Sequence, residues 1–146
     1  MKNKKSTIIV ALILSFLLAY YVPELEESSI KEFVTLELKE GSLTKTGAVF
    51  IFSNKTNDAF SYGEGFELEY KRDNFWVSLD SINDLGFSCM LYVLKGNESK
   101  EIVVNWEWYY GELESGEYRL VKSANKTKKN GTNTIKLDVR VELIID

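Results

Sequence analysis

The sequence predicts an all-β fold, an antiparallel sandwich of about seven or eight strands preceded by a hydrophobic N-terminal helix. Three observations carry this prediction. Eight runs of strand length are separated by turn signals. The aromatic content of 13% and the many β-branched residues favour strands over helices. Outside residues 6–22, no window of about 11 residues shows helical periodicity.

The first four predicted strands are recognised by their alternation and by the turns between them. Residues 34–39 alternate apolar and polar side chains, as a strand with one buried face does. Residues 48–52 are apolar throughout, which is typical of a strand covered on both faces. Residues 66–70 alternate again, and the polar turn at 72–74 leads into the run at 75–79, so these two strands are expected to form a hairpin.

The next two predicted strands follow a longer polar connection. Residues 87–94 form an apolar run, and the single cysteine, Cys89, is expected to be a small buried side chain within it. Residues 101–106 come after a turn that contains glycine and asparagine. At the end of this strand Asn105 is expected to cap one helical turn.

The last two predicted strands enclose a polar loop. Residues 117–122 form the first of them, with Arg119 and Lys122 expected mostly on its outer side. Residues 123–133 are rich in Lys, Asn and Thr and are interpreted as a loop. Residues 135–143 then show the strictest alternation in the chain, with apolar side chains facing one way and charged ones the other.

The first 22 residues are interpreted as an export or membrane segment. A head with three lysines precedes an unbroken apolar run at residues 6–22, which as a helix would span roughly 25 Å, close to the ~30 Å hydrocarbon core. This segment is either a signal peptide or an uncleaved membrane anchor, and an aromatic residue where cleavage needs a small one favours the anchor. Residues 23–29 read as a linker, and residues 30–146 as the folded domain.

The lysines before the apolar run predict where the protein resides. They place the N-terminus in the cytoplasm and the body of the chain outside it, as a single-pass protein of the cell membrane. If the segment is cleaved as a signal, the domain is secreted instead. In both cases the folded part works outside the cytoplasm.

Composition excludes several function classes. The 146 residues carry a formal charge of −4 and no histidine, so a nucleic-acid partner and imidazole catalysis are not expected. A single cysteine allows neither an internal disulfide nor a zinc or iron site built on paired cysteines. We therefore expect no cofactor and no catalytic residues.

A turn and a tyrosine near the end of the chain resemble a known family. Leu113, a turn that ends at Gly116 and Tyr118 just inside the next strand match a tyrosine corner, in which a phenol caps the loop entering a late strand of an immunoglobulin-like sandwich. With the motifs upstream, the chain resembles bacterial immunoglobulin-like (Ig-like) domains of small exported or membrane-anchored proteins. The resemblance covers about residues 30–121 and rests on Asn54–Asp58, Tyr62-Gly63, Trp76 and the stretch 111–122.

The resemblance implies an Ig-like antiparallel sandwich and assigns structural roles to four residues. Trp76 is expected to lie on a strand that packs across the core, although a stacking platform for a sugar or peptide is the alternative. Tyr118 is expected to donate a hydrogen bond to the loop before it, several residues upstream. Leu113 and Gly116 are expected to form that loop.

Two groups of side chains are candidates for a binding surface. The aromatic residues at 106–110 cannot all point inward, so they form either an exposed patch or a loop folded over the edge of the sandwich. The lysines of the loop at 123–133 could contact anionic lipid head groups, or simply be solvated at a hairpin tip. The residues concerned are Trp106, Trp108, Tyr109, Tyr110, Lys126, Lys128 and Lys129.

Three functions remain open. The first is a non-catalytic, membrane-tethered Ig-like module with a structural role or a protein or cell-envelope ligand. The second is a protease inhibitor that acts through an exposed loop. The third is a hydrolase or a calcium site built on carboxylates, for which the spacing alone is weak support. The carboxylates concerned are Glu64, Glu67, Glu69 and Asp73, or Glu112, Glu114 and Glu117.

Overall fold

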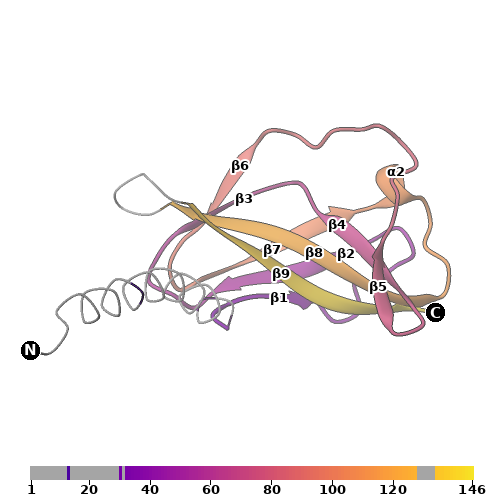
Figure 1. The fold of residues 1–146 in the computed structure, drawn as a ribbon, viewed down its shortest axis with the longest axis horizontal. Coiled ribbons are helices and arrows are strands. Elements are labelled where there is room, and N and C mark those ends of the chain that lie inside the picture. The colour runs from indigo at the N-terminus through magenta and orange to yellow at the C-terminus, as the bar shows by residue number, and fades with distance from the viewer. Residues whose placement is uncertain (1–12, 14–29, 31, 128–133) are drawn as a thin grey trace, which may run out of the picture.

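The computed structural model of the chain describes residues 13, 30, 32–127 and 134–146 (Figure 1). The predicted membrane segment and linker therefore lie outside the described residues, apart from Ile13. Within the described part, no helix combines the length and the apolar character needed to span a bilayer.

The smaller of two sheets has three antiparallel strands. Strand β2 lies between β1 and β7 and is paired along its whole length with β7. The inward positions of these strands are apolar and include Val34, Phe50, Phe52 and Val104, which are all buried. The strands are β1 (Val34–Leu38), β2 (Gly47–Asn54) and β7 (Glu98–Asn105).

The larger sheet has six strands and is organised around β8 (Gly116–Thr127). Strand β9 pairs with β8 over its full length, so it occupies one edge of β8 completely. Two shorter strands share the other edge, β4 beside one half of β8 and β3 beside the other half. Strand β5 extends the sheet beyond β4, and β6 extends it beyond β3. The bounds are β3 (Phe60–Gly63), β4 (Glu67–Arg72), β5 (Phe75–Ser78), β6 (Leu91–Leu94) and β9 (Thr134–Ile145).

The structure confirms an all-β sandwich, with nine strands in the described part rather than seven or eight. Strand β3 was not predicted, because Phe60–Gly63 is short and half polar. The apolar run at 87–94 is a strand only over Leu91–Leu94, and the expectation of a buried Cys89 is wrong because that residue is exposed in the preceding loop. The predicted loop at 123–133 begins later, since β8 continues to Thr127.

A tryptophan does pack in the core, but it is not Trp76. Trp106 is fully buried, and its indole nitrogen donates a 2.8 Å hydrogen bond to the Lys45 carbonyl oxygen. Trp76 lies half-buried on the outer face of the larger sheet, on the edge strand β5, with the Arg119 guanidinium 4.6 Å from its ring centre. The pairing of Trp76 with Lys71 in β4 places its ring on this charged outer face.

The predicted tyrosine corner is present. The Tyr118 hydroxyl donates a 3.1 Å hydrogen bond to the carbonyl oxygen of Glu114, four residues upstream. Gly116 lies under the ring, where an added Cβ would contact it at 3.5 Å. Leu113 is buried, and its backbone N–H donates to the same Lys45 carbonyl oxygen that Trp106 uses. This loop and the β1–β2 connection are thereby fixed together at one end of the sandwich.

The two tryptophans give a direct test of this arrangement. Trp106→Ala should lower the free energy of unfolding by about 3–5 kcal/mol, because it leaves a cavity in the core. Trp76→Ala should lower it by only about 1 kcal/mol, because it removes a surface cation–π contact. Urea denaturation of both variants measures the difference, and similar losses would show that the assignment of core and surface is wrong.

Candidate functional site

The larger sheet contains an interruption between β3 and β4. Both strands pair with the same edge of β8, but Glu64–Phe66 between them belong to neither. The interruption therefore leaves backbone carbonyl groups that no ladder hydrogen bond satisfies. The Lys122 ammonium group, from the middle of β8, donates to the carbonyl oxygens of Gly63 and Gly65 at 2.6 and 2.8 Å.

Lys122 is almost completely buried, with 3% of its surface exposed. Burial lowers the pKa of its amine to about 8, and the negative charge of Glu64 partly opposes that shift. The ammonium nitrogen also lies 5.8 Å from the ring centre of Tyr62. The side chain thus fills the interruption from within, as a cation held by two carbonyls and an aromatic face.

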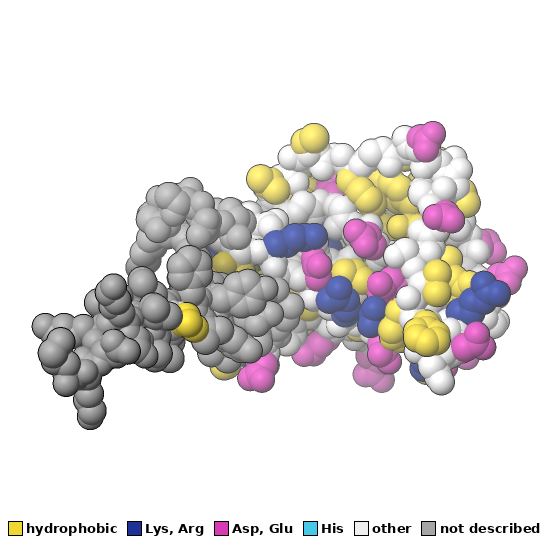
Figure 2. Space-filling view, viewed as in Figure 1, with side chains coloured by type: hydrophobic (Ala, Val, Ile, Leu, Met, Phe, Trp, Pro, Cys, Tyr) yellow, Lys and Arg dark blue, Asp and Glu magenta, His cyan; other side chains and the backbone are white. Residues whose placement is uncertain are grey.

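The interruption forms part of the wall of a cleft of about 460 Å³ between the two sheets. Aromatic rings from both sides of the interruption surround it: Tyr62 stacks on Tyr92 at 5.5 Å, and Phe87 stacks on Tyr109 at 4.4 Å. Phe66 meets the second pair edge-on at 5.2 Å from Phe87. Figure 2 shows apolar side chains gathered beneath the arch that residues 79–90 make between β5 and β6.

The opposite wall of the cleft is strand β7. Six consecutive residues, 100–105, line it, so the cleft is bordered by the strand's backbone and not by one of its faces alone. The charged groups nearby are already engaged. The Tyr92 hydroxyl donates to Glu64 at 2.8 Å, which raises the pKa of that phenol. Lys100 donates to the Val93 carbonyl oxygen at 2.7 Å, and Glu101 pairs with Lys39.

The four aromatic residues predicted as a group do not form one exposed patch. Trp106 belongs to the core, whereas Trp108 is 67% exposed on the one-turn helix α2 (Glu107–Tyr110). Tyr109 lines the cleft, and Tyr110 packs against Phe66 and the core. The predicted helical turn exists, but the prediction of Asn105 as its cap is wrong, because the N-cap is Trp106 and Asn105 precedes it, accepting from the N–H of Glu107. Of the four, only Tyr109 reaches the cleft.

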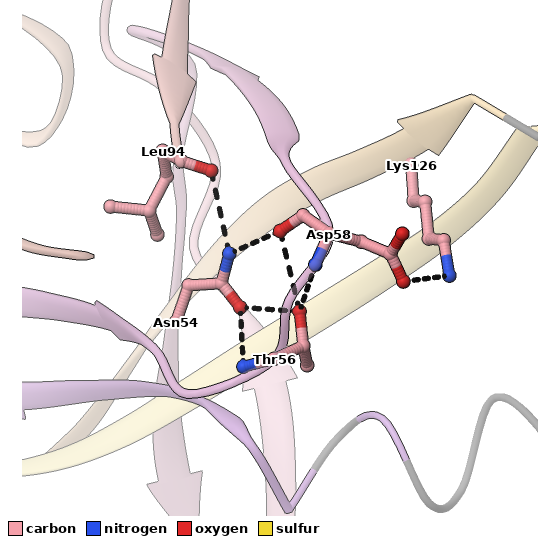
Figure 3. A network of polar contacts seen from close by, with 5 residues as sticks. All are labelled: Asn54, Thr56, Asp58, Leu94 and Lys126. Carbon is pink, nitrogen blue, oxygen red and sulfur yellow. Dashed lines mark hydrogen bonds and ion pairs between the residues drawn. The ribbon is translucent and has the colours of Figure 1, made fainter. Parts of the chain in front are cut away.

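The Asn54–Asp58 motif is structural (Figure 3). Asn54 is 1% exposed, and its amide donates to the carbonyl oxygens of Asp58 at 2.7 Å and Leu94 at 3.4 Å, as Figure 3 shows. The same amide donates to the Lys95 carbonyl oxygen at 2.9 Å. Its side-chain oxygen accepts from the backbone and hydroxyl groups of Thr56. An added Cβ on Gly96 would lie 2.6 Å from the Asn57 carbonyl oxygen, so only glycine allows the two turns to approach this closely.

The predicted basic loop is only partly described. Lys126 lies on β8 and pairs with Asp58 at 2.7 Å, so its ammonium group is engaged within the fold (Figure 3). Lys128 and Lys129 lie outside the described residues.

The candidate carboxylates have other partners. Glu69 pairs with Arg119 beneath Trp76, and Glu117 pairs with Lys71 on the same outer face. Asp73 occupies the β4–β5 turn with a φ of 55°. In the part of the chain that the structure describes, no three acidic or cysteine side chains are grouped as metal ligands. Glu69 and Glu117 therefore serve the outer surface of the sheet, whereas Glu64 lines the cleft.

Lys122 is the site residue that sequence reasoning missed. Its side chain was expected mostly on the outer side of the strand, as for Arg119. In the alternation of β8, however, Lys122 lies on the same face as Tyr118 and Leu120, which face the core. Strict alternation would have placed Lys122 inside. A lysine at an inward position signals buried carbonyl or carboxylate partners, because an unpaired buried ammonium is costly.

Burial of Lys122 predicts a distinct pH dependence of stability. Its pKa of about 8 in the folded protein lies below the ordinary value of 10.5, so between these values the unfolded chain binds more protons. The free energy of unfolding should therefore rise with pH, by roughly 1–2 kcal/mol between about pH 8 and 9.5. Above this window the raised pKa values of Tyr62 and Tyr118 act in the opposite direction.

Urea denaturation at several pH values measures the effect. Lys122→Met should abolish the rise, while Lys136→Met, which removes an exposed lysine from β9, should preserve it. A rise of the same size in the Lys122 variant would show that another group titrates.

Comparison with known proteins agrees with the geometry. A family model described as "Bacterial Ig-like domain" matches residues 30–139, which is most of the chain. Of the strands that the structure describes, the match covers β1 to β8 and the first half of β9. No curated protein matches the sequence. The family is generally non-enzymatic, and its domains serve as structural or binding modules. The chain belongs to the family of bacterial Ig-like domains.

Proposed function

We propose that this protein is a non-catalytic, extracytoplasmic binding module, tethered to the bacterial membrane, which holds a protein or cell-envelope ligand in the cleft between its sheets. The observation that carries the proposal is the cleft itself. It is about 460 Å³ in volume, open to solvent and lined by five aromatic rings. Pockets of this size and lining are typical of ligand sites.

The polar groups of the cleft favour binding over catalysis. The Lys122 ammonium is held by two carbonyl oxygens, and Glu64 accepts the Tyr92 hydroxyl. An acid or base needs access to a substrate proton, whereas these groups already have partners inside the protein. They are better suited to fixing the shape and polarity of a binding surface.

The proposed membrane tether is inferred from the sequence that precedes the domain. Residues 6–22 are apolar and follow three lysines, a pattern that favours a cytoplasmic N-terminus. The linker at 23–29 reaches at most ~25 Å when extended, so the domain would work close to the membrane surface. A cleaved segment would give a secreted module with the same cleft.

The proposal is tested with the full-length protein in its membrane. It should remain with membranes after a carbonate wash, keep its N-terminus, and retain an envelope component after mild cross-linking. Phe87→Glu, which places a charge in the cleft, should abolish that retention. Phe75→Glu is the matched control, because Phe75 is 74% exposed on β5 and does not line the cleft.

Two results would contradict the proposal. Equal retention by both variants would locate the ligand elsewhere. An N-terminus between Glu24 and Ser29 would replace the membrane anchor by a cleaved signal, without affecting the cleft.

The arch at residues 79–90 favours protease inhibition as a second candidate. Its first part is fixed to α2, since the Ile82 N–H donates to the Tyr109 carbonyl oxygen at 2.7 Å and the Asn83 amide donates to that of Trp108. Further along, Phe87 is fixed by its stacking on Tyr109. Between these points Leu85 is 50% exposed, as a residue offered to a protease subsite would be.

This candidate makes its own prediction. Incubation with a panel of endopeptidases should leave the arch intact and inhibit at least one of them at stoichiometric concentration. Leu85→Asp should abolish the inhibition, with Ile144→Asp as an exposed control far away in sequence. Rapid cleavage within residues 79–90 would refute inhibition through this loop.

A further inference from the structure

The cleft exposes one edge of strand β7, and the neighbouring hydrogen bonds identify which groups lie there. The Val49 N–H and carbonyl groups of β2 face β1, where they bond Ser42 and Lys39. Because successive residues of a strand point their backbone groups to opposite sides, Ala48 and Phe50 face β7. Their partners in the register are Val104 and Ile102.

It follows that Glu101 and Val103 point their N–H and carbonyl groups the other way, into the cleft. In the described part of the chain, β7 pairs with no strand other than β2. Strand β6, on the far side of the cleft, is paired with β3 instead. Two residues of β7 therefore offer donors and acceptors at the spacing that an extended peptide presents.

Sheet edges are commonly protected by charged side chains, which discourage pairing with other chains. The first half of β7 has this protection, with Lys100 engaged on Val93 and Glu101 on Lys39. The second half, Ile102–Val104, has none, and Val103 is 79% exposed. The unprotected half lines the same cleft as the aromatic rings.

The aromatic rings of the cleft provide a pocket for a side chain of the ligand, which a strand edge alone does not provide. Phe66, Phe87 and Tyr109 form one contacting group of rings opposite β7. In an added strand alternate side chains point to the same face, so every second residue could insert among these rings. Backbone pairing and a side-chain pocket together are the requirements for recognition by strand addition.

We propose that the free edge of β7 binds an extended peptide segment as an added strand, with an aromatic or branched aliphatic side chain inserted among Phe66, Phe87 and Tyr109. This inference rests on the proposed function and names the chemical class of its ligand. A second copy of the domain fits less well, because its own β7 edge lies in the same kind of cleft, beneath its own arch. A free, flexible segment has no such obstruction.

The first test uses octapeptides selected from a random phage-displayed library on the full-length protein in nanodiscs. Val103→Pro removes an N–H that faces the cleft and leaves the ladder to β2 intact, because Val103 does not bond that strand. The matched control is Val103→Thr, which keeps the N–H and a β-branched side chain. The proline variant should bind the selected peptides roughly threefold to tenfold more weakly per lost hydrogen bond, and the threonine variant should bind like the native protein.

A second test leaves the protein unchanged and does not depend on the folding of the proline variant. Each peptide nitrogen is methylated in turn, and the affinity of every methylated peptide is measured by fluorescence anisotropy. Methylation at positions that pair with β7 should weaken binding, while methylation at the alternate positions should not. A period of two residues in this series is the expected result.

Four outcomes would overturn the proposal. These are failure to select any peptide, affinities that ignore the methylation pattern, equal binding by the Val103→Pro and Val103→Thr variants, and a dimer in sedimentation that Val103→Pro dissociates. If the captured envelope component is a glycan and Phe87→Glu abolishes its capture, the strand-addition proposal is wrong, but the proposal that the cleft binds a ligand is supported. If no ligand requires the cleft for binding, both the strand-addition proposal and the proposed binding function are wrong.

Discussion

The carboxamide of Asn54 is the interaction on which the arrangement of the two sheets depends. It lies at the end of β2 in the smaller sheet, and it bonds the turn toward β3 and the turn between β6 and β7 at the same time. Because Asn54 itself is buried, separating the turns would leave its amide unsatisfied, at a cost of about 1–3 kcal/mol. This fixed end sets where β7 begins relative to β3 and β6, and residues of all three strands line the cleft.

Lys122 is the second buried polar anchor, and it differs from Asn54 in carrying a charge. Burial of the ammonium opposes folding, as its lowered pKa indicates, but the two carbonyl groups at the interruption need a donor. A continuous strand in place of β3 and β4 would need no lysine, and it would also close the space that the aromatic rings surround. The buried lysine therefore destabilises the domain at the place where the sheet is interrupted and the cleft is open.

Much of this fold can be predicted from alternation and turn chemistry, which identify the tyrosine corner and eight of the nine strands in the part of the chain that the structure describes. The errors have physical causes. The apolar run at 87–94 resembles a strand, yet Phe87 inserts its ring into the cleft and the residues after it stay exposed. Trp76 and Trp106 each lie in a plausible strand, and only tertiary pairing decides which faces the core. The cleft itself depends on contacts between residues more than 50 positions apart, which no local pattern encodes.

The central place of β8 has a consequence for the order in which the domain can fold. Strands β3 and β4 precede β8 by about 50 residues, and although they pair with β6 and β5, nothing joins these two pairs into one sheet until β8 exists. The β8–β9 hairpin, in contrast, closes over a short connection and can form without the rest. A ribosome making this chain releases β3 to β6 first, so the two halves of the larger sheet remain separate until β8 emerges. The larger sheet can therefore be completed only after β8 and then β9 have been made.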